Sequence, residues 1–122
     1  MQTSETVGFA LSVIAILPIA ITGVMYLFRV PVVVKNIQHV GFSHMLAPFG
    51  IIKILIAVLT MIPATSFVGV ILATGWMGGA IAAHIRTRQN FVFQALLPIL
   101  IWVGFGLRHQ AEMRALLGVN FR

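Results

Sequence analysis

Apolar residues along the chain fall into four long runs separated by short polar segments. The runs cover residues 7–28, 45–62, 68–85 and 91–107, and the one Lys, Arg, Asp or Glu residue within them is Lys53. At about 1.5 Å of rise per residue, a helix of this length reaches across the hydrocarbon core of a bilayer. Continuous runs indicate helices, because only helices and closed barrels satisfy their backbone groups in lipid. The pattern therefore predicts an all-α integral membrane protein.

The links between the later runs are short, which predicts an antiparallel bundle of four transmembrane helices. Pro63 is expected to end the second helix, and Ser66 to cap the third. Residues 108–122 follow the last run as a tail. The whole chain, residues 1–122, is expected to form a single membrane domain.

The link between the first two runs, residues 29–44, is longer and has a pattern of its own. Val33, Ile37 and Val40 recur in it at helical spacing, with polar residues on the opposite side. This pattern is typical of a short helix lying in the headgroup layer, between the first and second spans. An irregular loop is the alternative.

Composition supports the same class and excludes others. The 122 residues are 60% hydrophobic and 8% charged, against roughly 25% charged in ordinary soluble domains. The net charge is +6, but the basic residues lie between the apolar runs, so we expect contacts with lipid headgroups and no binding of nucleic acid. Cysteine is absent, which excludes disulfides and thiol chemistry within the chain.

Small residues form a stripe on the third predicted helix. Gly75, Gly79 and Ala83 follow one another at four-residue steps, and Gly78 lies beside them. Small residues on one face let helices approach closely in lipid, so the stripe predicts a helix–helix contact. The partner helix can belong to this bundle or to another subunit, either a different protein or a second copy.

Lys53 is the costliest residue in the apolar runs, because a charge within a bilayer needs a partner. Both acidic residues, Glu5 and Glu112, lie in the terminal segments. Lys53 is therefore expected to meet carbonyls, hydroxyls, water or a ligand. In the alternative, the second helix begins near Pro48 and the lysine side chain extends to the membrane surface.

Alternating helix directions would bring polar side chains from all four helices into the half of the membrane nearest the 29–44 link. We expect them to form a polar pocket that opens on that side and binds a ligand with carbonyl or anionic oxygens, such as a quinone head group. Alternatively, His84 is a polar helix end and Tyr26 an aromatic-belt residue. No metal site is expected. The predicted ligand-binding residues are Thr22, Tyr26, Lys53, Trp76, His84 and Gln94.

Three motifs resemble those of the DoxX-like membrane proteins: Gly-x-x-Lys at residues 50–53, Ile62-Pro63, and Gly-Gly-Ala-x-x-x-His at residues 78–84. The resemblance covers nearly the whole chain and implies a four-helix protein of prokaryotic plasma membranes. Its family name comes from a subunit associated with thiosulfate:quinone oxidoreductase. Lys53 and His84 fall on the characteristic Lys and His positions. The family usually has an acidic residue soon after this His, where the present chain has residues 88–90, Arg-Gln-Asn, and so lacks that proton acceptor.

Together, the polar cluster and the resemblance predict an accessory subunit of a quinone-linked redox system, with a polar pocket accessible from lipid. The alternative is a structural or assembly subunit of a larger membrane complex that has no ligand chemistry of its own. A third class, small-molecule transport, is disfavoured by the small number of helices and the lack of an inverted repeat. No catalytic constellation is evident, since the membrane runs contain neither a thiol nor a carboxylate.

Overall fold

The computed structural model describes residues 3–118, and every regular element in this range is helical. The all-α class predicted from the apolar runs is thus confirmed. Two short 3-10 turns, Ser43–Met45 and Pro63–Thr65, precede the second and third long helices. The α-helices are α1 (Thr3–Leu27), α2 (Pro31–His39), α3 (Leu46–Met61), α4 (Ser66–Arg86), α5 (Val92–Arg108) and α6 (Gln110–Leu117).

The long helices have the length and apolar character of membrane spans. Three segments are sufficient by themselves: Thr3–Leu27, Ser43–Met61 and Pro63–Arg86. The 17-residue α5 reaches the same standard only together with α6, from which it is bent by 112°. The described chain therefore contains three candidate spans, or four if the bent pair counts as one, as expected of a multi-pass membrane protein.

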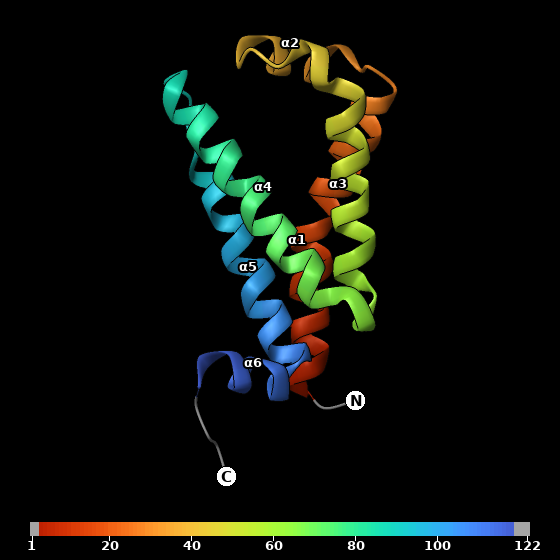
Figure 1. Cartoon of the computed structure of the whole chain (residues 1–122), viewed down its shortest axis with the longest axis vertical. Helices are drawn as coiled ribbons and strands as arrows, with labels where there is room; N and C mark the ends of the chain where they lie inside the picture. Colours follow the sequence, from red (N-terminus) through yellow and green to blue (C-terminus); the bar gives the residue numbers. More distant parts are fainter. Residues whose placement is uncertain (1–2, 119–122) are drawn as a thin grey trace.

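The four long helices pack as a ring in which α1 and α4 each contact both α3 and α5. Figure 1 shows the chain ascending along α1 and α4 and descending along α3 and α5, with α2 at one end and both termini at the other. Toward the α2 end, α4 and α5 lean away from α1 and α3 (Figure 1). Below this divergence, α1, α3, α4 and α5 contribute to one apolar core, which includes Ile16, Ile56, Val70 and Ile101.

Glycines on α1 allow close contacts with two neighbouring helices. A Cβ at Gly8 would lie 2.7 Å from Leu107 Cβ on α5, and a Cβ at Gly23 would lie 3.0 Å from Lys53 Cβ on α3. Real Cβ atoms almost never come within 3.0 Å of a neighbour, so a side chain at Gly8 would force a shift, and one at Gly23 would require its neighbour to move by a few tenths of an ångström. These glycines therefore fix how closely α5 and α3 pack against α1.

The predicted cap at Ser66 is wrong. The N-cap position of α4 is Thr65, and it makes no side-chain capping bond. Ser66 already has helical dihedral angles, and its Oγ donates a hydrogen bond of 2.7 Å to the carbonyl of Thr60, in the last turn of α3. The hydroxyl therefore ties the two helices together across their turn.

The link before α3 contains a helix, α2, as the spacing of its apolar residues indicated. Val33, Ile37 and Val40 are all at most 8% exposed. Ile37 and Val40 share a cluster with Leu46, against which Tyr26 packs. The apolar face of α2 therefore covers the end of the bundle. The carbonyl of Val40 also accepts a hydrogen bond from the guanidinium of Arg86, which links α2 to the end of α4.

Candidate functional site

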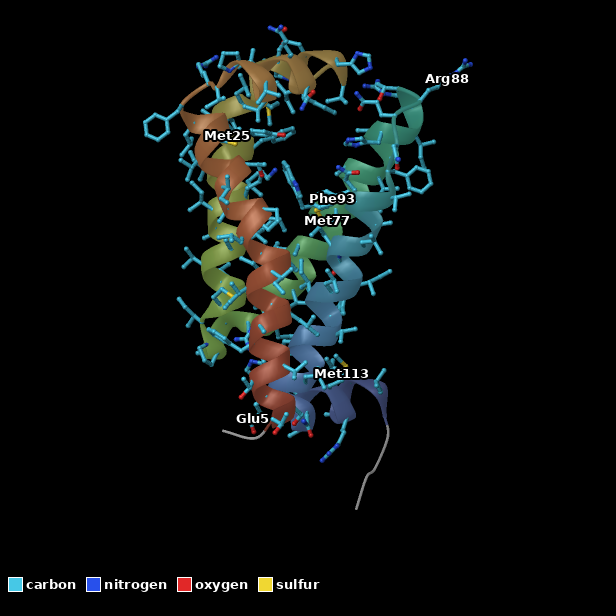
Figure 2. The ribbon with its side chains drawn as sticks, turned by 180° about the vertical axis from the view of Figure 1, so that it is seen from behind. Glu5, Met25, Met77, Arg88, Phe93 and Met113 are labelled. Carbon is cyan, nitrogen blue, oxygen red and sulfur yellow. The ribbon has the colours of Figure 1, made fainter. Side chains whose placement is uncertain are left out.

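A cavity of about 580 Å³ occupies the space where the helices diverge beneath α2. Its lining comes from α1, α2, α3, α4, α5 and the segment between α4 and α5. Figure 2 shows two of its lining residues, Met77 and Phe93, at the level where the helices separate. The volume lies within the range of about 300–1,000 Å³ typical of small-molecule sites.

The cavity brings together all the residues that the sequence analysis assigned to a ligand site. They come from four different helices and are separated by up to about 70 positions along the chain. Each of them is part of the lining: Thr22, Tyr26, Lys53, Trp76, His84 and Gln94.

Lys53 lies in the middle of α3 and faces inward, with 8% of its surface exposed. Its Nζ lies 4.7 Å from the centroid of the Tyr26 ring and 5.8 Å from that of Trp76. The negative faces of aromatic rings attract a cation at such distances. The side chain is thus buried against two rings and does not extend to the membrane surface.

Lys53 has no carboxylate nearby. Figure 2 shows Glu5 at the terminal end of the molecule, and Glu112 belongs to α6 at the same end. No hydrogen bond or ion pair joins Nζ to another residue of the range 3–118. Its three donors are therefore available to a ligand or water in the cavity.

Aromatic side chains form the wall around this ammonium. Phe49 packs edge-on against Trp76, with ring centroids 4.8 Å apart and an interplanar angle of 88°. Phe49 lines the cavity but was missed by the sequence analysis. Its position one turn before Lys53 on α3 is the signal that could have identified it.

His84 lines the cavity near the end of α4. Its Nδ1 lies 2.7 Å from the carbonyl oxygen of Ala80, one turn earlier in the same helix. Because a carbonyl only accepts hydrogen bonds, Nδ1 carries the proton in the neutral ring. Nε2 is then a hydrogen-bond acceptor, and it has no partner within residues 3–118.

Thr22 and Gln94 contribute differently. The hydroxyl of Thr22 donates to the carbonyl of Pro18 at 2.8 Å, so its proton is already engaged within α1. The Oε1 atom of Gln94 is buried and lacks a hydrogen-bond partner in the described part of the chain. Gln94 is thus the lining residue with an unsatisfied buried acceptor, which costs stability unless a donor reaches it.

The glycines of the α4 stripe do not contact another described helix, whereas Ala83 packs against the cluster of Ile37, Val40 and Leu46. Gly75, Gly79 and Ala83 are part of the lining, whereas Gly78 is not. A Cβ at any of the three glycines would have no described atom beyond the backbone of its own helix within 4 Å. Part of the cavity thus exists because α4 lacks side chains here. Packing of the glycines against another subunit stays a prediction.

The apolar face of α2 closes the cavity from above. Val33, Ile37 and Val40 belong to the lining, together with Asn36 from the same helix. The sequence analysis identified the spacing of the three apolar residues and placed the helix in the headgroup layer, but it did not predict what their face contacts. Their low exposure shows that this face turns toward the bundle.

The family of the chain follows from comparison with known proteins. The model of a family described as the DoxX-like family matches residues 10–105. The matched range contains Lys53, Tyr26 and His84, together with the rest of the cavity lining. Comparisons with curated proteins and with solved structures produced no match. Because the family match spans well over half of its length, the chain belongs to the DoxX-like family.

Proposed function

We propose that this protein is an accessory subunit of a quinone-linked redox system in a prokaryotic plasma membrane. Its role there is to hold a quinone head group in the cavity beneath α2. In this arrangement α5 serves as the fourth span of an antiparallel bundle, and the ligand arrives through the lipid. The redox centre that exchanges electrons with the quinone belongs to a partner protein.

The observation that carries this proposal is the buried, unpaired ammonium of Lys53 facing a cavity with aromatic walls. A buried charge is costly unless its donors are satisfied. A quinone carbonyl offers an acceptor to Nζ, and its flat ring suits the faces of Tyr26 and Trp76. The mixture of apolar walls and a few polar groups is typical of sites for amphipathic ligands.

The cavity lining offers hydrogen-bonding groups to a ligand. It contains no Asp, Glu or Cys, and its ionisable side chains are Tyr26, Lys53 and His84. These side chains can orient a ligand and donate or accept hydrogen bonds.

The direct test is binding of menadione, a quinone without a long tail, to the full-length protein in detergent micelles. Quinones quench indole fluorescence, so we would follow the emission of Trp76 and subtract the quenching that persists in Trp76→Phe. Lys53→Leu should weaken binding by roughly 10- to 100-fold, because hydrogen bonds to charged groups contribute about 1.5–3 kcal/mol. Lys35→Leu is the matched control, since Lys35 is exposed on α2 and outside the cavity.

Two results would count against the proposal. If wild-type protein does not bind menadione, the cavity does not hold quinone head groups. If Lys53→Leu and Lys35→Leu bind menadione equally well, Lys53 is not the ligand-binding group.

A role in assembly of a larger membrane complex is the second candidate. The observation in its favour is the outer side of α4, where Gly78 and Ala82 are exposed and no described atom would contact a Cβ at Gly78. Small exposed residues allow another membrane helix to approach closely. After mild extraction, native mass measurement should then show a complex that Gly78→Leu disrupts. A monomer with menadione bound would argue against this role.

A further inference from the structure

Two polar groups of the cavity lining, Lys53 and His84, have opposite hydrogen-bonding character. Lys53, on α3, offers N–H donors and a positive charge. His84, on α4, offers an acceptor at Nε2 when the ring is neutral, since its Nδ1 proton is engaged by the Ala80 carbonyl. A ligand that satisfies both groups needs an acceptor oxygen at one position and a hydroxyl or N–H donor at another.

We infer that the cavity binds the hydroquinone form of a quinone more tightly than the oxidised form, with a hydroquinone hydroxyl donating to His84 Nε2 and the other oxygen accepting from Lys53. This inference rests on the proposed function, because it specifies which redox form of the ligand the same cavity favours. It assigns His84 a binding role that depends on the donor capacity of the ligand.

The physical reason lies in what each form of the ligand can do at His84. Both oxygens of an oxidised quinone are acceptors, so at the neutral imidazole an oxygen lone pair would meet the nitrogen lone pair without a proton between them. Reduction adds a hydrogen to each oxygen, and one hydroxyl then satisfies Nε2. The oxygen at Lys53 can still accept, because a hydroxyl retains its lone pairs.

The cavity lining contains both a donor, at Lys53, and an acceptor, at His84, whereas a pocket lined by donors alone would satisfy only acceptor oxygens. If both walls presented only donors, the oxidised form would be favoured. The Nδ1–carbonyl contact of 2.7 Å excludes the neutral tautomer that would turn an N–H of His84 toward the ligand. The preference for the reduced form therefore follows from the tautomer that the Ala80 carbonyl selects.

The test compares three ligands of nearly the same shape under anaerobic conditions at pH 8: menadione, its hydroquinone menadiol, and the dimethyl ether of menadiol. The ether keeps two oxygen acceptors but has no O–H donor. Affinities for the full-length protein in micelles are measured by isothermal titration calorimetry, because only the oxidised ligand is a quinone that quenches indole fluorescence. We expect menadiol to bind about tenfold more tightly than either other ligand. Such a ratio raises the two-electron midpoint potential of the bound pair by about 30 mV.

Variants assign the preference to His84. In His84→Ala, and in His84→Leu as a second variant, the menadiol-to-menadione affinity ratio should fall to about one. His44→Ala should leave the ratio at its wild-type value, because His44 is exposed and outside the cavity. Lys53→Leu should weaken the binding of both menadione and menadiol, because each offers an acceptor oxygen to Nζ.

The possible results separate this inference from the proposed function. Equal binding of menadione and menadiol to wild-type protein would overturn the inference and leave quinone binding intact. A preference for menadiol that persists in both His84 variants, or that extends to the dimethyl ether, would also overturn it. Failure of the protein to bind any of the ligands would overturn the proposed function as well.

Discussion

Substituting Gly104 with alanine should loosen the contact between α5 and α1. A Cβ at this position would lie 2.5 Å from Ser12 Oγ and 3.0 Å from the carbonyl oxygen of Gly8. Ser12 is 1% exposed, and its Oγ accepts a hydrogen bond of 3.2 Å from Arg108. The hydroxyl therefore cannot move away without losing that bond, so the two helices must separate.

The expected magnitude follows from these contacts. Overpacking of a tight contact typically costs about 1–3 kcal/mol, and loss of a hydrogen bond costs about 1 kcal/mol more. Alanine is a better helix former than glycine by about 1 kcal/mol, which offsets part of the cost. The free energy of unfolding of Gly104→Ala should therefore fall by about 1–3 kcal/mol.

The assay is reversible unfolding in mixed micelles, in which increasing the fraction of dodecyl sulfate reduces the helical circular dichroism signal. Gly78→Ala is the matched control, because it brings the same gain in helix propensity where no described atom lies within 4 Å of the new Cβ. Its stability should equal or exceed that of the wild type. If Gly104→Ala is as stable as Gly78→Ala, the close approach of α1 and α5 at this position does not hold, and the reasoning is refuted.

Two further predictions concern the cavity. Gly79→Leu should place a side chain in the cavity and weaken menadione binding at least tenfold. Gly78→Leu, one position away and outside the lining, should leave menadione binding unchanged. Equal effects of the two variants in the quenching assay would show that Gly79 does not line the menadione site. Arg86→Ala should release α2 from α4 and raise amide hydrogen exchange in residues 31–39 roughly tenfold, since a charged donor is lost from a carbonyl at the end of α2. Arg88→Ala is the control, because Arg88 is exposed and points away from the molecule (Figure 2). Similar amide hydrogen exchange in the two variants would show that the hydrogen bond from Arg86 to Val40 does not hold α2 in place.

Six residues of the cavity lining could be predicted from the sequence, because alternating helix directions limit where a polar residue can lie. Lys53 lies in the middle of one apolar run and His84 near the end of another, which places both in the part of the bundle that extends from its middle to the 29–44 link, and few other polar residues compete in the apolar runs. What such reasoning lacked was rotation about the helix axis. It could not establish that Phe49 turns toward Trp76 while Ile51 and Ile52 on α3 face outward.

The glycines show more clearly which contacts cannot be predicted from the sequence pattern. Gly75, Gly78 and Gly79 form the most regular small-residue stripe, and the sequence favoured them as a packing face. In the described chain close contacts are made instead at glycines outside the stripe, among them Gly8, Gly69 and Gly104. A glycine permits close approach but does not require it, so the pattern alone cannot say which glycine meets a neighbour and which borders an empty space.

By itself, the sequence determined the class of this protein, because runs of about 20 apolar residues with almost no charge are stable only as helices in lipid. It also indicated the half of the membrane in which the polar residues lie, since that follows from alternating helix directions. The tertiary structure decided that α4 and α5 diverge from α1 and α3 beneath α2 and leave a cavity there. Helix tilt depends on the fit of side chains from segments distant in the chain, such as Gly8 with Leu107 and Gly23 with Lys53. No local pattern encodes that fit.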